Sequence, residues 1–234
     1  MGTASQLVDL VLQLIGEPHL KVNAIEYVNQ TIREMHTHPD DDQRILLFPD
    51  NLSEVAVVAD LESGYYYTIP NPQRLQVVGV VYYNAYGCYA EEKSPLSAYR
   101  LGTTHYYYRS GKTLQFNAYG GIGATITLAS YYHPRRLIYY PAGTNPCTWS
   151  NETESYTYLD AYNGSDALKA EAEELSTNWI IERWFEVVRL GVEAKLWARV
   201  NKDASQVRAY SQYMSGRKSM LSAEKHEVAT RYAN

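Results

Sequence analysis

The sequence predicts an α+β protein in which helices from both ends of the chain form a bundle, with an antiparallel β-sandwich or barrel-like domain inserted between them. Apolar residues recur at helical spacing near both ends, whereas the middle alternates with period two and is rich in Tyr. A chain of 234 residues with 45% hydrophobic residues can bury a core without disulfide staples. We expect four parts: N-terminal helices 1–43, a Tyr-rich β-domain and loop 44–164, C-terminal helices 165–221 and a C-terminal arm 222–234.

Two helices are expected in the first forty residues. Thr3 is followed three residues later by a Gln, which forms a capping-box pattern, and Gly16 ends the first apolar stripe. Asn23, with a Glu three residues later, offers a second helix start. Pro39 disfavours helix in the residue before it, so the second helix should end there.

The middle of the chain contains a series of short strand candidates. One segment, 106–116, reads as a β-hairpin with its turn at Ser110 and Gly111. The last candidate closes the series just before a loop-like stretch that is expected from 141 to 164. The candidates are residues 45–48, 55–58, 65–69, 75–83, 106–116, 125–128 and 137–140.

Tyrosine is used far more often than the other aromatic residues. The chain has 23 Tyr against 3 Phe, and 19 of these Tyr lie between Tyr65 and Tyr162. A Tyr ring suits a half-buried position whose hydroxyl is wet or hydrogen-bonded. Two interpretations stay open: a protein interface, which is enriched in Tyr, and an ordinary β-sheet surface, which favours it as well.

Helices return after the loop. An Ala- and Glu-rich helix is expected over 167–175, and Asn178 is expected to cap a longer one over 179–200, with Trp184 and Trp197 mostly buried. Asp203 then starts the last helix. Its expected core stripe is Val207, Tyr210, Met214 and Leu221. Beyond Leu221 little apolar surface remains, which indicates a free arm or a helix extension that a partner orders.

Charge is distributed unevenly. The segment Arg199–Asn234 has seven Lys and Arg against three Asp and Glu, a net charge of +4, which leaves −9 for the rest of the chain. Such an acidic body disfavours nucleic-acid binding and opposes self-association until a partner organises the copies. The basic tail indicates a docking element, or simply a solvated helix face. The expected partner-binding residues are Arg217, Lys218, Lys225 and Arg231.

Motifs that suggest catalysis have ordinary explanations. The segment 110–113 ends like a phosphate-binding loop, but Tyr106 stands where that loop needs Gly. The His and Asp residues of 36–42 follow no familiar ligand spacing. Cys88 and Cys147 lack the context of a nucleophile. We therefore expect no enzyme activity, no cofactor and no metal, and no apolar run is long enough to span a membrane.

Several stretches carry a resemblance to a known family. They are the helix pair TASQLVDLVLQLIGE and NAIEYVNQTIREMH, the β segment ending KTLQFNAYGGIGATITLASYYHPRRLIYY, and the helical C-terminus that begins TNWIIERWFEVVRLGVEAKLWARVNKDASQVRAY. The Tyr131–Leu137 stretch reads Tyr-Tyr-x-Pro-x-x-Leu, and Asp203 with Tyr210 marks the start of the last helix. In this layout the chain resembles the head-to-tail adaptor (connector, head-completion) proteins of tailed bacteriophages.

The resemblance implies a structural virion protein that forms a ring, usually dodecameric, on the portal and connects the capsid to the tail. Its implied partners are the portal protein, tail nozzle or tail-tube proteins and neighbouring copies of itself. DNA would pass through the ring without specific binding, and no catalytic residue is implied. The implied location is the neck of the virion, after assembly in the host cytoplasm, with no membrane involved. The alternatives are another tail component, such as a tail terminator, or a Tyr-rich carbohydrate-binding module.

Overall fold

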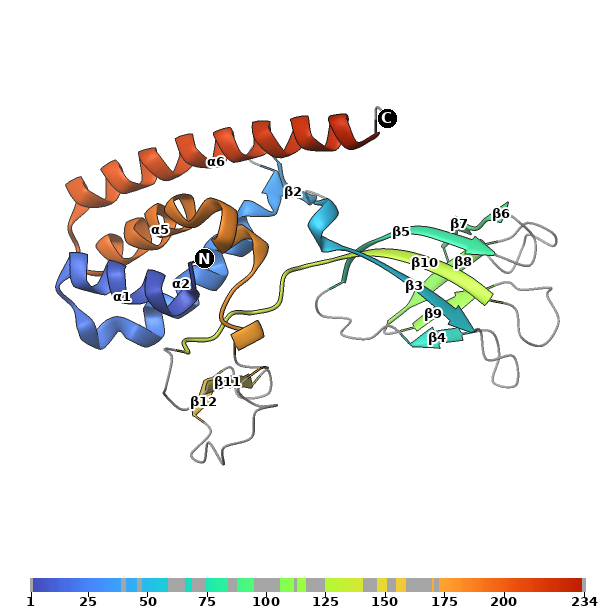
Figure 1. Ribbon diagram of the computed structural model, residues 1–234, viewed down its shortest axis with the longest axis horizontal. Coiled ribbons are helices and arrows are strands. Elements are labelled where there is room, and N and C mark those ends of the chain that lie inside the picture. Colours follow the sequence, from blue (N-terminus) through green and yellow to red (C-terminus); the bar gives the residue numbers. More distant parts are fainter. Residues whose placement is uncertain are drawn as a thin grey trace. The chain divides into compact units, whose positions relative to one another are not determined.

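The computed structural model shows an α+β chain, as predicted (Figure 1). The described residues are 2–38, 41–45, 48–58, 66–68, 75–83, 88–94, 106–111, 113–116, 125–140, 147–150, 155–158, 170 and 173–232. The chain divides into two compact units: Met1–Leu46 with Pro134–Asn234, and Leu47–His133. The second unit is shorter than the expected β-domain 44–164, because the chain after His133 packs with the helices.

Four long helices build the first unit. Among them α5 packs against each of the other three, so its apolar side chains lie at the centre of the unit (Figure 1). The helices are α1 (Ala4–Ile15), α2 (Lys21–Met35), α5 (Trp179–Arg199) and α6 (Asp203–Tyr232), with a short 3₁₀ turn, η1 (Pro18–Leu20), before α2.

Local signals set most of the helix ends. The capping box is confirmed, since the Thr3 hydroxyl accepts from the Gln6 amide at 3.2 Å and the Gln6 side chain accepts from the Thr3 amide at 3.0 Å. Gly16 ends α1 in the left-handed conformation, with φ +81°. The expected start of the second helix at Asn23 is wrong by two residues, because the turn that begins at Pro18 leads directly into α2.

The start of α5 is confirmed, and its interior holds a kink. Asn178 Oδ1 accepts from the amide of Ile181 at 3.0 Å. Trp184 departs from helical geometry, with φ −124° and ψ 33°. Trp197 is buried, as expected, whereas Trp184 is only half-buried. The indole Nε1 of Trp184 donates to Glu224 Oε1 of α6 at 3.0 Å, so the kinked turn is tied to the last helix.

The buried face of α6 agrees with the expected stripe at Leu221, which is 8% exposed, but not at Val207 and Tyr210. Val207 and Tyr210 are 66% and 54% exposed. The side that packs inward instead carries Ala209, Tyr213, Arg217, Met220 and Glu224. The side with Val207, Tyr210 and Met214 is more apolar. The packed side, however, has the small residues Ala209 and Gly216, which let α6 approach α5 closely.

Glycines mark the closest approach of the helices. A Cβ atom on Gly191 of α5 would stand 2.5 Å from a methyl group of Thr31 and 3.0 Å from the ring of Tyr213. A Cβ atom on Gly216 of α6 would stand 2.9 Å from Val187. Substituted side chains at either glycine would therefore force α2, α5 and α6 apart.

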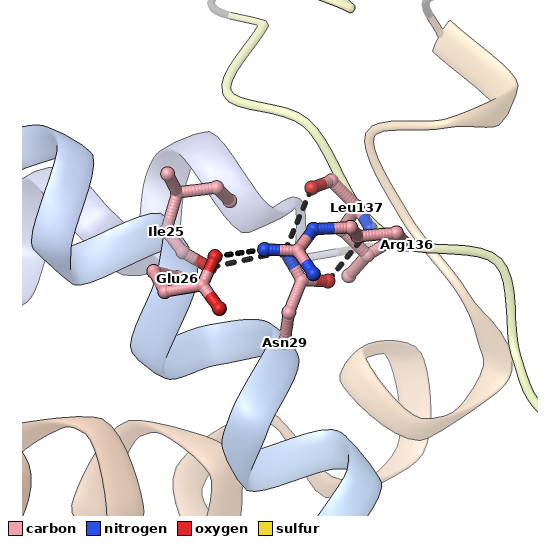
Figure 2. Close-up of polar contacts among 5 residues, drawn as sticks. All are labelled: Ile25, Glu26, Asn29, Arg136 and Leu137. Atoms are coloured by element: carbon pink, nitrogen blue, oxygen red, sulfur yellow. Dashed lines mark hydrogen bonds and ion pairs between the residues drawn. The ribbon is translucent and has the colours of Figure 1, made fainter. Parts of the chain in front are cut away.

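The segment 134–140 returns to the helices in an irregular conformation, so the expected strand 137–140 is wrong. The side chains from Leu137 to Tyr140 are all buried. Asn29 of α2 acts in place of a neighbouring strand: its Oδ1 accepts from the Leu137 amide at 2.7 Å, and its Nδ2 donates to the Leu137 carbonyl at 3.0 Å (Figure 2). The preceding Arg136 forms an ion pair with Glu26, also on α2 (Figure 2).

The same segment is tied to other elements at its far end. The amide of Tyr140 donates to Ser5 Oγ at 2.6 Å, and the hydroxyl of Tyr139 donates to Asp9 Oδ1 at 2.8 Å, both on α1. The amide of Ile138 donates to the Leu175 carbonyl at 3.0 Å. Side chains and carbonyls of the helical unit thus replace the ladder that a strand would have used.

Two antiparallel strand pairs belong to the first unit. In the first pair, β1 (Thr37–His38) joins β2 (Asp41–Ile45). The expected strand 45–48 begins at the last residue of β2, and residues 46–47 lie outside the described residues. In the second pair, β11 (Cys147–Ser150) joins β12 (Ser155–Tyr158), within a stretch expected to be a loop. Of the expected helix 167–175, residues 170 and 173–175 are described, and 170, 173 and 174 are helical.

Two four-stranded sheets form the second unit, together with η2 (Pro49–Asn51). One has the order β3-β10-β5-β6 and is antiparallel throughout, and the other has the order β4-β9-β8-β7, in which β7 and β8 run parallel. As far as the strands are described, both sheets are open. The strands are β3 (Leu52–Val58), β4 (Tyr66–Thr68), β5 (Leu75–Tyr83), β6 (Cys88–Tyr89), β7 (Glu91–Glu92), β8 (Tyr106–Ser110), β9 (Thr113–Phe116) and β10 (Thr125–Tyr132).

Tyr side chains occupy packed positions in this unit. The hairpin β8–β9 is confirmed, and within it Tyr107 is buried while Tyr106 and Tyr108 are half-buried. The Tyr107 hydroxyl donates to Glu92 Oε2 at 3.3 Å. Burial, together with the nearby Glu92 carboxylate, raises the pKa of Tyr107.

We expect Asn29→Ala to lower the free energy of unfolding by about 1–3 kcal/mol, because it leaves the buried Leu137 backbone without its amide partner. Gln30→Ala, an exposed neighbour on α2, is the matched control and should change stability by less than about 0.5 kcal/mol. Urea denaturation of both variants measures the difference. Equal midpoints for the two variants would show that the Asn29 contacts contribute nothing.

The contact between Trp184 and Glu224 should couple α5 to α6. Trp184→Phe and Glu224→Ala each remove one partner of the hydrogen bond, and we expect a coupling energy of about 1 kcal/mol in a double-mutant cycle. Chemical denaturation of the parent, the two single variants and the double variant gives this value. Strictly additive effects would contradict the coupling.

Candidate partner-binding surface

Arg217, the first of the four expected partner-binding residues, lies inside the helical unit. Only 8% of it is exposed, and its Nη2 donates to the carbonyl of Glu34 at 2.7 Å and to the carbonyl of Thr37. These carbonyls lie at and just beyond the C-terminal end of α2, where a helix leaves acceptors without partners. A cation is also favoured there by the helix dipole. Arg217 therefore caps α2 from α6 and faces the interior of the helical unit.

Other groups at the same helix end are also engaged within the chain. Lys195 of α5 forms an ion pair with the Glu34 carboxylate at 2.7 Å. Tyr213 of α6 is buried, and its burial, together with the nearby Glu34 carboxylate, raises the pKa of its hydroxyl. The end of α2 thus joins α5 and α6 through polar side chains. This role of Arg217 and Tyr213 was not expected, because the apolar spacing along α6 predicts a different side of the helix against the core.

The other three expected partner-binding residues, Lys218, Lys225 and Arg231, lie further along α6. Lys218 is exposed, because successive residues of a helix point about 100° apart and Arg217 takes the inward direction. Lys225 and Arg231 lie on the backbone of α6, which continues as helix through the expected arm to Tyr232. Their side chains lie outside the described residues. The partner-binding role of these three cations stays a prediction.

Two outward surfaces of the helical unit carry large apolar side chains. We define the α6 face as Val207, Tyr210 and Lys218, which are exposed on one side of the helix. We define the α1 face as Asp9, Leu10 and Leu14. In it Leu10 and Leu14 are 41% and 51% exposed, and Asp9 is exposed as well. Each face therefore combines two apolar side chains with one charged residue, a cation on α6 and a carboxylate on α1.

A small cavity opens beside the start of α1. Its volume is about 260 Å³, and its lining includes Ser5 and Asp9, which already bind the returning segment 134–140. The packing of that segment therefore forms part of the cavity. The lining residues are Thr3, Ser5, Gln6, Asp9, Tyr140, Glu173 and Ser176.

Motifs that resemble chemical sites take structural positions. The segment 110–113 is the turn of the hairpin β8–β9, with Gly111 at φ +57° and the Thr113 hydroxyl donating to the Ser110 carbonyl at 2.9 Å. His36 is buried edge-on against Trp179, with ring centroids 6.3 Å apart. Where the chain is described, no three His, Cys, Asp or Glu residues gather as metal ligands. None of the described helices is both long and apolar enough to cross a bilayer.

Comparison with known proteins gives no assignment. No protein-family model matches the sequence, and no curated protein is significantly similar to it. The candidate surface is therefore defined by its own geometry and charge.

Neighbouring cations on α6 should respond differently to substitution. Arg217→Ala leaves the α2 carbonyls without their buried cation, and we expect a loss of about 2 kcal/mol in the free energy of unfolding. Lys218→Ala, one residue further along the same helix, should change it by less than about 0.5 kcal/mol. Guanidinium denaturation measures both. If Arg217→Ala is as stable as Lys218→Ala, the cap on α2 has no energetic role.

Proposed function

We propose that the protein is a structural virion protein, a head-to-tail adaptor of a tailed bacteriophage. In this proposal its copies form a ring, of twelve in the usual arrangement, that docks on the portal and connects the capsid to the tail. The observation that carries the proposal is α6, a helix of 30 residues with exposed apolar side chains on its outer side. Residues 225–232 extend this helix past Glu224, the last buried side chain among those described.

A ring subunit needs several binding surfaces that remain soluble before assembly. The helical unit has two such surfaces, the α1 face and the α6 face, in each of which two apolar side chains accompany one charged residue. An interface between copies, rather than a catalytic cleft, is what these faces fit. We propose an assembly role without enzymatic activity, cofactor or metal, at the virion neck after assembly in the host cytoplasm.

The basic end of α6 is the proposed contact with the portal, through Lys218, Lys225 and Arg231. Tail nozzle or tail-tube proteins would bind elsewhere on the ring. DNA would pass through without specific contacts, since the net charge of −9 outside the C-terminal segment repels phosphate.

We further propose that the two open sheets belong to one sandwich or barrel-like domain. Leu114 in one sheet and Leu128 in the other are both buried, which supports a shared core.

Electron microscopy of the purified chain mixed with the portal protein of the same phage tests the function. We expect rings seated on the portal for the parent. A truncation of residues 226–234 should keep the thermal midpoint, because it spares Glu224 and its contact with Trp184, but should lose portal binding. Lys202→Ala, an exposed cation before α6, is the control and should bind like the parent. If no rings of the parent protein are seen on the portal, the proposed function is wrong. If the truncated protein binds the portal as well as the parent does, residues 226–234 take no part in the binding.

A further inference from the structure

The cavity beside the start of α1 has the size of a site for a single side chain. Segment 134–140 and residues 173–176 pack near the first turns of α1 and leave a volume of about 260 Å³. That volume is just below the range of about 300–1,000 Å³ in which drug-sized ligands bind. All of the lining residues belong to the helical unit, so the cavity is complete within it.

Two carboxylates line this cavity without a cation of their own. Asp9 accepts a hydrogen bond from the Tyr139 hydroxyl. Neither Asp9 nor Glu173 forms an ion pair with any Lys or Arg that the structure describes. Other glutamates of the helical unit do have such partners. The pairs are Glu26–Arg136, Glu34–Lys195 and Glu174–Arg135.

The two stretches of sequence that supply most of the lining are acidic. The first twenty residues contain Asp9 and Glu17 and no Lys or Arg, and residues 170–182 contain four Glu and no Lys or Arg. Lys21 lies over the ring of Tyr139, 4.5 Å from its centroid, and not in an ion pair with Asp9. A cation that enters the cavity is therefore attracted by its charges and meets none of its own sign in the lining.

Nearly buried hydroxyl groups in the lining add further acceptors. Ser5 and Ser176 are only 3% and 6% exposed. The Ser5 oxygen accepts from the Tyr140 amide at 2.6 Å, and the Ser176 hydroxyl donates to the Glu173 carbonyl at 2.7 Å. A hydroxyl oxygen has two lone pairs, so each of these oxygens can accept one more hydrogen bond. The N–H groups of a cation are donors only, and they match these acceptors and the two carboxylates.

We infer that this cavity binds the cationic side chain of an Arg or Lys that a partner protein presents. The lining is mostly apolar and suits the methylene stem of such a side chain, while the charged group meets the carboxylates and hydroxyls. A free polyamine has the same chemistry. The small volume, however, favours one stem with one charge over a longer molecule with several. This site goes beyond the proposed function and does not depend on it.

An NMR titration of the isotope-labelled full chain, at constant ionic strength, tests the site. The probe is propylguanidinium, the side chain of Arg cut before Cα, and propylurea is its neutral analogue of similar shape. We expect propylguanidinium to shift the amide signals of Ser5, Asp9 and Ser176 saturably at millimolar concentrations, because exposed charge pairs contribute little. Propylurea should leave them unchanged. No saturable shift, or equal shifts with propylurea, would overturn the inference.

Variants locate the binding in the cavity. Glu173→Gln and Asp9→Asn should each weaken binding of propylguanidinium about 2- to 5-fold. Both residues are exposed, and Asn keeps an oxygen for the Tyr139 hydroxyl, so both variants should keep the thermal midpoint of the parent. Glu182→Gln removes an exposed carboxylate in the first turn of α5, outside the cavity, and should bind like the parent. If the control weakens binding as much as the cavity variants do, or if neither cavity variant weakens it, the site is wrong.

A second set of titrations identifies the source of the cation. A capped tripeptide with a central Arg should bind at least as tightly as propylguanidinium, and the same peptide with a central Gln should not bind. If spermidine binds more tightly than the Arg peptide, a free polyamine is the occupant and the assignment to a side chain is wrong. Because these titrations use the isolated chain, their failure leaves the portal-binding proposal standing, and a chain that ignores the portal leaves this site standing.

Discussion

The chain returns from the second unit to the helices through segment 134–140, which is irregular and whose residues 137–140 are buried. The helical unit depends on the contacts that satisfy the backbone of this segment. Segment 134–140 has no neighbouring strand, so its amides and carbonyls need other partners. Asn29 supplies an acceptor and a donor at Leu137, while Ser5 accepts from Tyr140. Both helices of the N-terminal pair thereby depend on residues more than a hundred positions later.

Polar side chains hold the C-terminal helix in the same manner. Arg217 satisfies carbonyls at the end of α2, and Glu224 accepts from Trp184 at the kink of α5. A buried polar group without a hydrogen-bond partner destabilises the folded state more than a buried apolar group does. The contacts of Arg217 and Glu224 therefore favour the one arrangement of the helices in which both are made. Arg217 and Glu224 are buried on α6 beside apolar residues, whereas Val207 and Tyr210 are exposed. These two exposed side chains form the apolar part of the candidate surface.

This arrangement supports a role in assembly. Exposed apolar side chains beside a cation on one helix, and beside a carboxylate on another, suit contacts that form between copies or with a partner. The Tyr-rich unit adds packed rings whose hydroxyls are bonded, as at Tyr107. The proposed adaptor function combines the two helical faces with the extended end of α6.

Local chemistry explains what the sequence by itself determined. The capping box at Thr3, the Asn178 cap and the hairpin turn at Gly111 each depend on residues a few positions apart, and the α+β class follows from the change of period along the chain. Tertiary contacts decided the rest. The stretch 137–140 has strand composition, yet the backbone of Leu137 pairs with the side chain of Asn29. Val207 and Tyr210 of α6 face outward because the side with Ala209 and Gly216 packs more closely on α5. Which surface of a helix is buried depends on the shape and the unsatisfied polar groups of its neighbours, and spacing along a single segment does not contain that information.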